Sequence, residues 1–125
     1  MSTILIVEDN DKNMKLVRDI LQHRGHATLE ATTGEDGVRL AIEARPELIL
    51  MDIQLSGIDG IEALRRIRAR PELDAVPVLA VSASVMPDDQ RHIGSSGFDA
   101  FLTKPISLKP FVAAVERFLK NGRGG

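Results

Sequence analysis

The sequence predicts an α/β fold in which helices cover both faces of a parallel β-sheet. Short apolar runs alternate with segments of helical period five times along the chain. The runs begin about 20 to 30 residues apart, which is the spacing that βαβ units need. The runs at residues 4–7, 48–51 and 78–81 are apolar throughout, as in strands buried on both faces. Right-handed crossovers would then place helices on both sides of the sheet.

Five runs are predicted to be strands. In order, they are Ile4–Val7, His26–Ala31, Leu48–Met51, Val78–Val81 and Ala100–Thr103. The second run mixes polar and apolar residues, so we expect it at an edge of the sheet.

Each predicted helix has apolar residues at helical spacing, with glycine or proline at its end. These apolar faces consist of Met14, Val17, Ile20 and Leu21; of Val38, Ala41 and Ile42; of Ile61, Leu64 and Ile67; and of Phe111, Val115, Phe118 and Leu119. Asn10 or Asp11 can cap the first helix, and Gly25 ends it. The segment Asp88–Ile93 has one large apolar residue and leads into Gly94–Gly97, so we expect a marginal, mobile helix there.

Size and composition limit the function classes. With 125 residues, the chain has room for one domain, expected at residues 1–120, a frayed tail at 121–125 and no effector domain. Cysteine is absent, which excludes disulfides and thiolate metal sites and suits the cytoplasm. No basic leader or long hydrophobic stretch occurs, so we expect neither secretion nor membrane insertion.

The charged and aromatic residues argue against nucleic-acid binding. Net charge is -2 and the aromatic residues are four Phe, whereas nucleic-acid binders usually have a basic surface and stacking aromatics. The arginines at positions 65, 66, 68 and 70 are interpreted as a solvated helix, because helical steps spread them around its circumference. The three histidines, His23, His26 and His92, are interpreted as solvated surface residues.

Chemically active residues follow four of the predicted strands. They are Glu8 with Asp9, Asp52, Ser82 and Lys104. Taken singly, each has a simpler explanation as a helix cap, a turn former or a surface lysine. In an open parallel sheet, however, ligands bind outside the carboxyl ends of the strands, so all five side chains are expected to converge.

This convergence predicts a site for a metal ion and a phosphoryl group. Two carboxylates 4 Å apart repel by about 4 kcal/mol at an effective dielectric constant near 20, so a cation must lie among them. Oxygen ligands without His or Cys favour a hard cation such as Mg²⁺ or Mn²⁺. Asp52 would then be a nucleophile that forms an acyl phosphate, Lys104 a point charge for the phosphate and Ser82 a hydrogen-bond donor to a phosphoryl oxygen.

With these residues, the sequence resembles the receiver domain of two-component response regulators. The resemblance runs essentially end to end, through Ile4–Asn10, Leu50–Ile53, Gly57–Gly60, Ala80–Ala83 and Lys104-Pro105. It implies a flavodoxin-like (βα)5 fold with strand order 2-1-3-4-5.

The resemblance also implies the roles of the site residues. Asp52 would be the phosphoacceptor and Lys104 the phosphate-pairing lysine. The metal would be held by Asp9, Asp52 and the backbone carbonyl of Gln54, and by Glu8 through water. Ser82 and Phe101 would be the switch residues, although Phe101 is equally well explained as a core residue of its strand.

Further features follow from the same resemblance. The Lys104-Pro105 bond is expected to be cis. Ser56 stands where many receivers have Pro, and Gln54 and Ser84, expected beside the phosphoryl group, carry no charge.

The expected partners are a histidine kinase or phosphatase, a histidine phosphotransfer protein, and a downstream protein. The downstream protein would bind a monomer at the Asp88–Ile93 segment, the strand Ala100–Thr103 and the last helix, through a shift between two conformations. The protein would not be an enzyme beyond its own phosphorylation and dephosphorylation.

Three alternative functions make different demands on these residues. A phosphorelay intermediate would use the same pocket and stays open. A phosphohydrolase with an aspartyl nucleophile would need a second Asp where Gln54 stands. A flavodoxin-like cofactor binder would need a phosphate loop after the first strand, where Glu8 and Asp9 would repel the phosphate.

Overall fold

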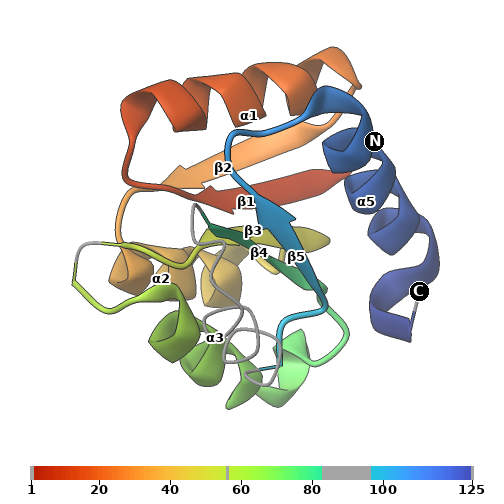
Figure 1. The fold of residues 1–125 in the computed structure, drawn as a ribbon. Coiled ribbons are helices and arrows are strands. Elements are labelled where there is room, and N and C mark those ends of the chain that lie inside the picture. The colour runs from red at the N-terminus through yellow and green to blue at the C-terminus, as the bar shows by residue number, and fades with distance from the viewer. Residues whose placement is uncertain (1, 56, 83–96, 125) are drawn as a thin grey trace.

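Five parallel strands form a single sheet in the computed structural model, which describes residues 2–55, 57–82 and 97–124 (Figure 1). The strands are β1 (Thr3–Val7), β2 (Ala27–Ala31), β3 (Leu48–Asp52), β4 (Val78–Ser82) and β5 (Ala100–Thr103). The helices are α1 (Asp11–His23), α2 (Gly34–Ala44), α3 (Gly60–Arg68) and α5 (Leu108–Asn121), with short 3-10 turns at η1 (Pro71–Leu73) and η2 (Gly122–Gly124). The predicted fold class is therefore confirmed.

The strand order is β2-β1-β3-β4-β5, as the family resemblance implied. All four pairs are parallel, and Val7 is aligned with Met51, Asp52 with Val81 and Ser82 with Thr103. The mixed strand β2 lies at an edge, as its polar residues predicted. Because the strands are parallel, their carboxyl ends lie along one edge of the sheet.

Each face of the sheet has its own hydrophobic core. On one face, Ile4, Ile6, Leu48 and Leu50 pack with Met14 and Val17 of α1 and Phe111 and Val115 of α5. On the other, Leu5, Val7, Ile49 and Met51 pack with Ala41 of α2 and Leu64 and Ile67 of α3. Alternate residues of each central strand thus face opposite cores, which holds the strands rigidly in place.

Side chains that follow the strands cap three helices. The Asn10, Thr33 and Asp59 side chains accept hydrogen bonds from the backbone N–H groups of Asn13, Asp36 and Glu62, at 3.0, 3.1 and 2.8 Å. Each cap satisfies a backbone donor that the first helical turn leaves unpaired. The loops at the carboxyl ends of β1, β2 and β3 therefore supply the residues that begin α1, α2 and α3.

Residues 122–124 form the 3-10 turn η2, in which Arg123 pairs with Asp99 at 3.0 Å. Two expectations from the sequence are wrong. Arg68 is not a solvated arginine, since its side chain is 17% exposed and pairs with Asp99. His26 is half-buried, and its Nδ1 atom is shielded from solvent without a hydrogen-bond partner.

Some expectations fall outside the described residues. These are the marginal helix at Asp88–Ile93, with His92, and the residues Ser56 and Ser84. Among the described helices, none is long and apolar enough to cross a membrane.

Candidate functional site

The carboxyl ends of β1, β3 and β5 bring three charged side chains into direct contact. Lys104 Nζ lies 2.9 Å from Glu8 Oε1 and 2.9 Å from Asp52 Oδ2. Glu8 and Asp52 are 4% and 3% exposed, although charged residues are almost never fully buried unless they are paired. The sequence predicted that these residues would converge, and the structure brings them together.

Asp52 is fixed through both of its carboxylate oxygens. Oδ1 accepts a hydrogen bond from the backbone N–H of Gln54 at 2.9 Å, and Oδ2 accepts one from Lys104. Asp52 is the last residue of β3, and the Ile53 N–H continues the ladder by donating to the Val81 carbonyl at 3.1 Å. The sheet and the following loop therefore orient the carboxylate together.

Glu8 is a carboxyl with perturbed acidity. Its Oε2 accepts a hydrogen bond from the backbone N–H of Asn10 at 3.2 Å. Burial first, and then a hydrogen bond with Asp52, raise the pKa of Glu8 from 4.5 to about 7, although Lys104 opposes the rise. Burial alone would lower the pKa of Lys104, but the hydrogen bonds to Glu8 and Asp52 raise it, so Lys104 remains an ammonium. One cation thus faces two carboxyls that compete for it.

The same carboxyls form a group that can bind a metal ion. Ligand oxygens of Glu8, Asp9 and Asp52 all lie within 4.8 Å of one another, and Asp9 is the exposed member of the group. An all-oxygen set of acidic ligands, open to solvent on one side, fits Mg²⁺, which keeps several of its waters. Mn²⁺ takes similar ligands.

The remaining predicted site residues lie on β4, on β5 and in the loops that follow β3 and β5. Ser82 is fully buried at the end of β4, and its carbonyl accepts a hydrogen bond from the Lys104 N–H at 2.9 Å. Phe101 is half-buried on β5 and lines a cavity of about 210 Å³ together with Ile106 and Phe111. The Gln54 side chain is exposed, and the Lys104-Pro105 bond is cis.

One residue near the site was missed as a functional position by sequence reasoning. A Cβ atom at Gly60 would lie 2.5 Å from the Asp52 carbonyl oxygen and 2.8 Å from Ile53 Cα. Glycine therefore lets the start of α3 approach the backbone of Asp52. The Gly57–Gly60 motif indicated a turn, but the approach itself has no local pattern.

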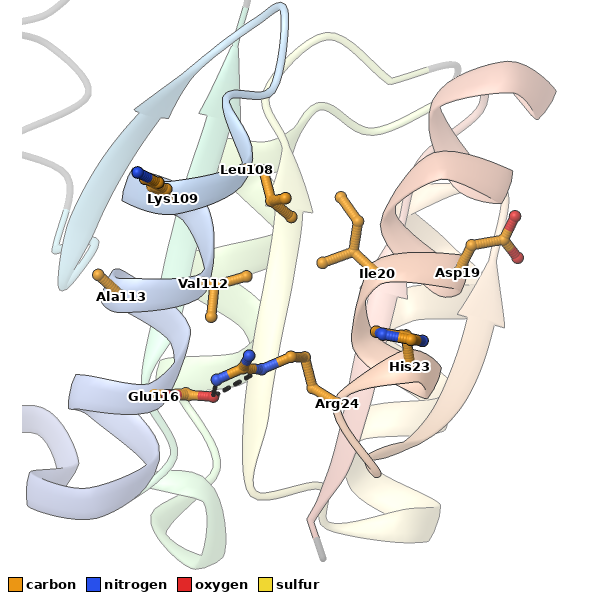
Figure 2. A pocket seen from close by; sticks show the side chains of 9 residues that line it. All are labelled: Asp19, Ile20, His23, Arg24, Leu108, Lys109, Val112, Ala113 and Glu116. Atoms are coloured by element: carbon orange, nitrogen blue, oxygen red, sulfur yellow. Dashed lines mark hydrogen bonds and ion pairs between the residues drawn. The ribbon is translucent and has the colours of Figure 1, made fainter.

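A separate groove lies between α1 and α5, and none of the predicted site residues lines it (Figure 2). Its volume is about 790 Å³, and Arg24 of the α1 cap and Glu116 of α5 bridge it with a contact of 2.6 Å. Its lining residues are Asp19, Ile20, His23, Arg24, Leu108, Lys109, Val112, Ala113 and Glu116.

Comparison with known proteins agrees with the fold and shows the family. The curated relatives include the polar-differentiation response regulators DivK of Brucella anthropi and Brucella ovis. They are 40% and 39% identical over 117 residues, and each match covers 94% of this chain and 95% of the relative.

Solved structures give the same result. The receiver domain of sensor histidine kinase PA1611 from Pseudomonas aeruginosa has a magnesium ion coordinated in its active site cleft. It matches with a TM-score of 0.85 and 31% identity, over 99% of this chain and 98% of that one. A putative response regulator from Chloroflexus aurantiacus matches with a TM-score of 0.91 and 26% identity, over 96% and 98%. The family model for the response regulator receiver domain matches residues 4–116, so the chain belongs to this family of signalling domains.

Proposed function

We propose that the protein accepts a phosphoryl group on Asp52 from a phosphohistidine of a kinase or phosphotransfer protein, in a reaction that depends on Mg²⁺. The observation that carries this proposal is the ion-paired triad of Glu8, Asp52 and Lys104 beside the exposed Asp9. Asp52 and Glu8 each accept a hydrogen bond from the N–H two residues later and each contact the lysine, and it is the family resemblance that assigns the acceptor role to Asp52.

The transfer follows from these contacts. A carboxylate oxygen of Asp52 attacks phosphorus, and an O–P bond forms while the P–N bond to the donor imidazole breaks. The imidazole nitrogen keeps the electron pair and takes up a proton. The Lys104 ammonium can move from the Asp52 carboxylate to a phosphoryl oxygen, because it is a compact point charge on a flexible stem.

The metal would be held by Asp9, Asp52 and the Gln54 backbone carbonyl, with Glu8 acting through water. When bound, Mg²⁺ neutralises charge on the transferring group. Glu8 and Asp9 place negative charge where the metal is needed, and Ser82 lies at the neighbouring strand end to hydrogen-bond a phosphoryl oxygen.

The output would be a protein-protein interaction that depends on phosphorylation. Movement of Ser82 and Phe101 would change the surface of β5 and α5 and of the Asp88–Ile93 segment, where a downstream protein would bind. The DivK relatives, which the match covers almost completely, support a role in bacterial cell division and polarity. In this scheme, residues 1–120 act as a cytoplasmic monomer without turnover of a separate substrate.

A phosphorelay intermediate is the second candidate. Receiver domains of sensor histidine kinases are among the similar structures, including PA1611 at 31% identity. The pocket would be the same, and the phosphoryl group would pass on to a histidine phosphotransfer protein.

The first test is labelling with a small phosphodonor such as acetyl phosphate and Mg²⁺. We expect one phosphoryl group on the parent protein and none on Asp52→Asn, which should remain folded because the amide can still accept from the Gln54 N–H. Asp59→Asn, a cap at the start of α3, is the matched control and should be labelled like the parent. Equal labelling of Asp52→Asn would refute the assignment.

A second experiment separates a switch from a relay. The protein is held active with beryllofluoride and Mg²⁺ and used to capture partners, beside Asp52→Asn. Partners bound only by the activated form indicate a switch. Capture of phosphotransfer proteins alone, independent of activation, indicates a relay.

A further inference from the structure

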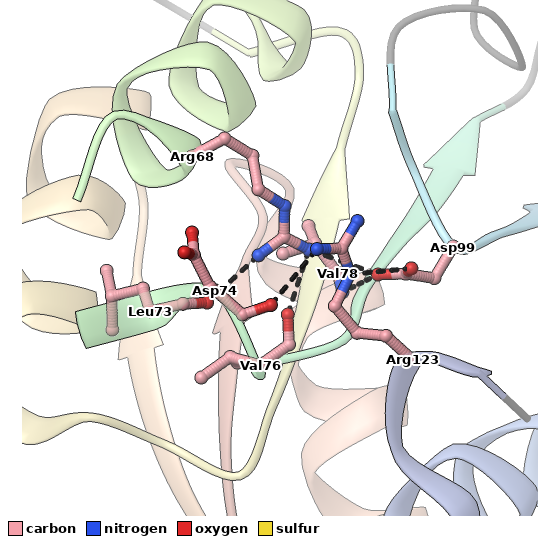
Figure 3. Close-up of polar contacts among 7 residues, drawn as sticks. All are labelled: Arg68, Leu73, Asp74, Val76, Val78, Asp99 and Arg123. Carbon is pink, nitrogen blue, oxygen red and sulfur yellow. Dashed lines mark hydrogen bonds and ion pairs between the residues drawn. The ribbon is translucent and has the colours of Figure 1, made fainter. Parts of the chain in front are cut away.

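A second charged cluster lies at the opposite end of the sheet, where β4 and β5 begin (Figure 3). Its centre is Asp99, whose side chain is 7% exposed. Asp99 Oδ2 accepts hydrogen bonds from Arg68 Nη2 at 3.1 Å and from the Val78 N–H at 2.8 Å. Asp99 Oδ1 accepts a hydrogen bond from Arg123 Nε at 3.0 Å. The proposed phosphotransfer uses none of these residues.

The two arginines connect Asp99 to three other parts of the chain. Arg68, at the end of α3, also donates to the carbonyls of Leu73 and Val76 at 3.0 and 2.9 Å. Arg123, just after α5, donates to the Asp74 carbonyl at 3.0 Å. One buried carboxylate therefore joins the end of α3, the loop before β4, the start of β5 and the C-terminal turn.

Asp99 forms two hydrogen bonds with the backbone of Val78. The Asp99 N–H donates to the Val78 carbonyl at 2.9 Å, while the Asp99 carboxylate accepts from the Val78 N–H. These bonds lie immediately before the first aligned pair of the ladder, Leu79 with Ala100. Asp99 is therefore held beside Val78 at the point where the two strands begin to pair.

Strand β5 needs such a constraint because it specifies its own alignment weakly. It has four residues, lies at the edge of the sheet and pairs with β4 alone. None of its residues is fully buried, and Thr103 is exposed, so no deeply buried side chain fixes the register. A slip by one residue would move the strand by about 3.3 Å and turn each side chain to the other face.

We propose that Asp99 is a positioning residue that sets the register of β5 and thereby places Lys104 against Asp52. Lys104 directly follows β5, and its ammonium lies 2.9 Å from the Asp52 carboxylate. A slip of about 3.3 Å exceeds that whole contact distance. Arg68 and Arg123 neutralise Asp99 and hold it in place, so the C-terminal turn supports the site from the far end of the sheet.

The effect of Asp99 on phosphorylation rests on the proposed function, whereas its effect on register does not. The test uses Asp99→Ala, Asp99→Asn, Lys104→Ala and the double variant Asp99→Ala/Lys104→Ala in the full chain. The control is Glu116→Gln, which breaks another contact between distant elements, the one with Arg24, and does not involve β5. Asp99→Asn keeps an acceptor for the Val78 N–H and serves if Asp99→Ala does not fold.

Two measurements are made on each folded variant. Nuclear Overhauser contacts across β4 and β5 report the register. The rate of labelling by acetyl phosphate and Mg²⁺ reports the site. We expect Asp99→Ala to lose the contacts between Leu79 and Ala100 and to be labelled about tenfold to a hundredfold more slowly.

The outcomes are distinct. Asp99→Ala should add no further loss to Lys104→Ala, because both changes remove the same contact. A retained register with labelling at the parent rate would overturn the proposal, and so would a loss that simply adds to that of Lys104→Ala. If the parent itself is not labelled, the proposed function fails, and the cross-strand contacts alone then decide whether Asp99 sets the register.

Discussion

Lys104 is the residue on which the site's electrostatics depend. Its ammonium is 2.9 Å from each of two carboxylates that are almost completely buried. Removing one partner of a buried ion pair typically costs 3 to 5 kcal/mol, about as much as the whole net stability of a weakly stable domain. Two carboxyls share this one lysine, and the exposed Asp9 adds a third carboxyl to the same group. A second cation therefore has a place there.

Glu8 should make the stability of the metal-free protein depend on pH. The pKa of Glu8 is about 7 in the folded protein, above the ordinary value of 4.5. Protonation of Glu8 therefore stabilises the folded state relative to the unfolded state. This contribution is fully present below pH 4.5 and is lost as the pH rises through 7. We expect the free energy of unfolding to fall by up to about 3 kcal/mol over that interval from this group.

The measurement is urea unfolding in EDTA between pH 4.5 and 8, followed by circular dichroism because the chain lacks Trp and Tyr. Glu8→Gln should flatten the decrease, since the amide does not titrate. Glu43→Gln, on the exposed side of α2, should leave it unchanged. A decrease of the same size in Glu8→Gln would show that another group titrates.

At the scale of elements, the strand ends were predictable from the sequence and the far end of the sheet was not. The apolar runs that end at Asp52 and near Lys104 predicted both the strands and the convergence of the side chains that follow them. Asp99, in contrast, pairs with residues 31 and 24 positions away, and nothing local distinguishes Arg68 from its solvated neighbours Arg65 and Arg66. Periodicity identifies which face an element buries, but not which distant charge it meets.

The start of α3 gives a prediction at this scale. Gly60→Ala would place a Cβ atom 2.5 Å from the Asp52 carbonyl oxygen, so either the helix or the end of β3 must move. Alanine improves helix propensity by about 1 kcal/mol, but overpacking against backbone typically costs 1 to 3 kcal/mol, so the variant should be less stable. Its labelling rate should also fall, because the displaced backbone carries Asp52.

Gly25→Ala provides the comparison. Gly25, in the turn between α1 and β2, has a φ of 89° and open space around its missing Cβ atom, so this substitution strains the backbone at a place that contacts neither the carboxylates nor the Asp99 cluster. It should lower the unfolding free energy while the labelling rate stays at the parent value. If Gly60→Ala were labelled at the parent rate, the close approach of α3 would have no influence on Asp52.

At the scale of the whole molecule, the reactive carboxylates and the Asp99 cluster lie at opposite ends of the sheet. The carboxylates lie at the carboxyl ends of the strands, the Asp99 cluster lies where β4 and β5 begin, and two hydrophobic cores lie between them. Two central strands, β1 and β3, are buried on both faces from Ile4 to Val7 and from Leu48 to Asp52. A ligand at the strand ends therefore acts on groups that belong to the most stable part of the fold.

Mg²⁺ should consequently stabilise the entire domain. An ion that binds only the folded state adds about 2.7 kcal/mol to the unfolding free energy at a concentration 100 times its dissociation constant. Thermal or urea unfolding in MgCl₂, compared with KCl at equal ionic strength, measures this gain. Asp9→Asn should reduce the gain, because Asp9 is the exposed member of the ligand group, whereas Asp36→Asn on α2 should keep it. An equal gain in KCl would mean that salt screening relieves the repulsion among the carboxylates, and the acidic group would then be an electrostatic feature without a metal.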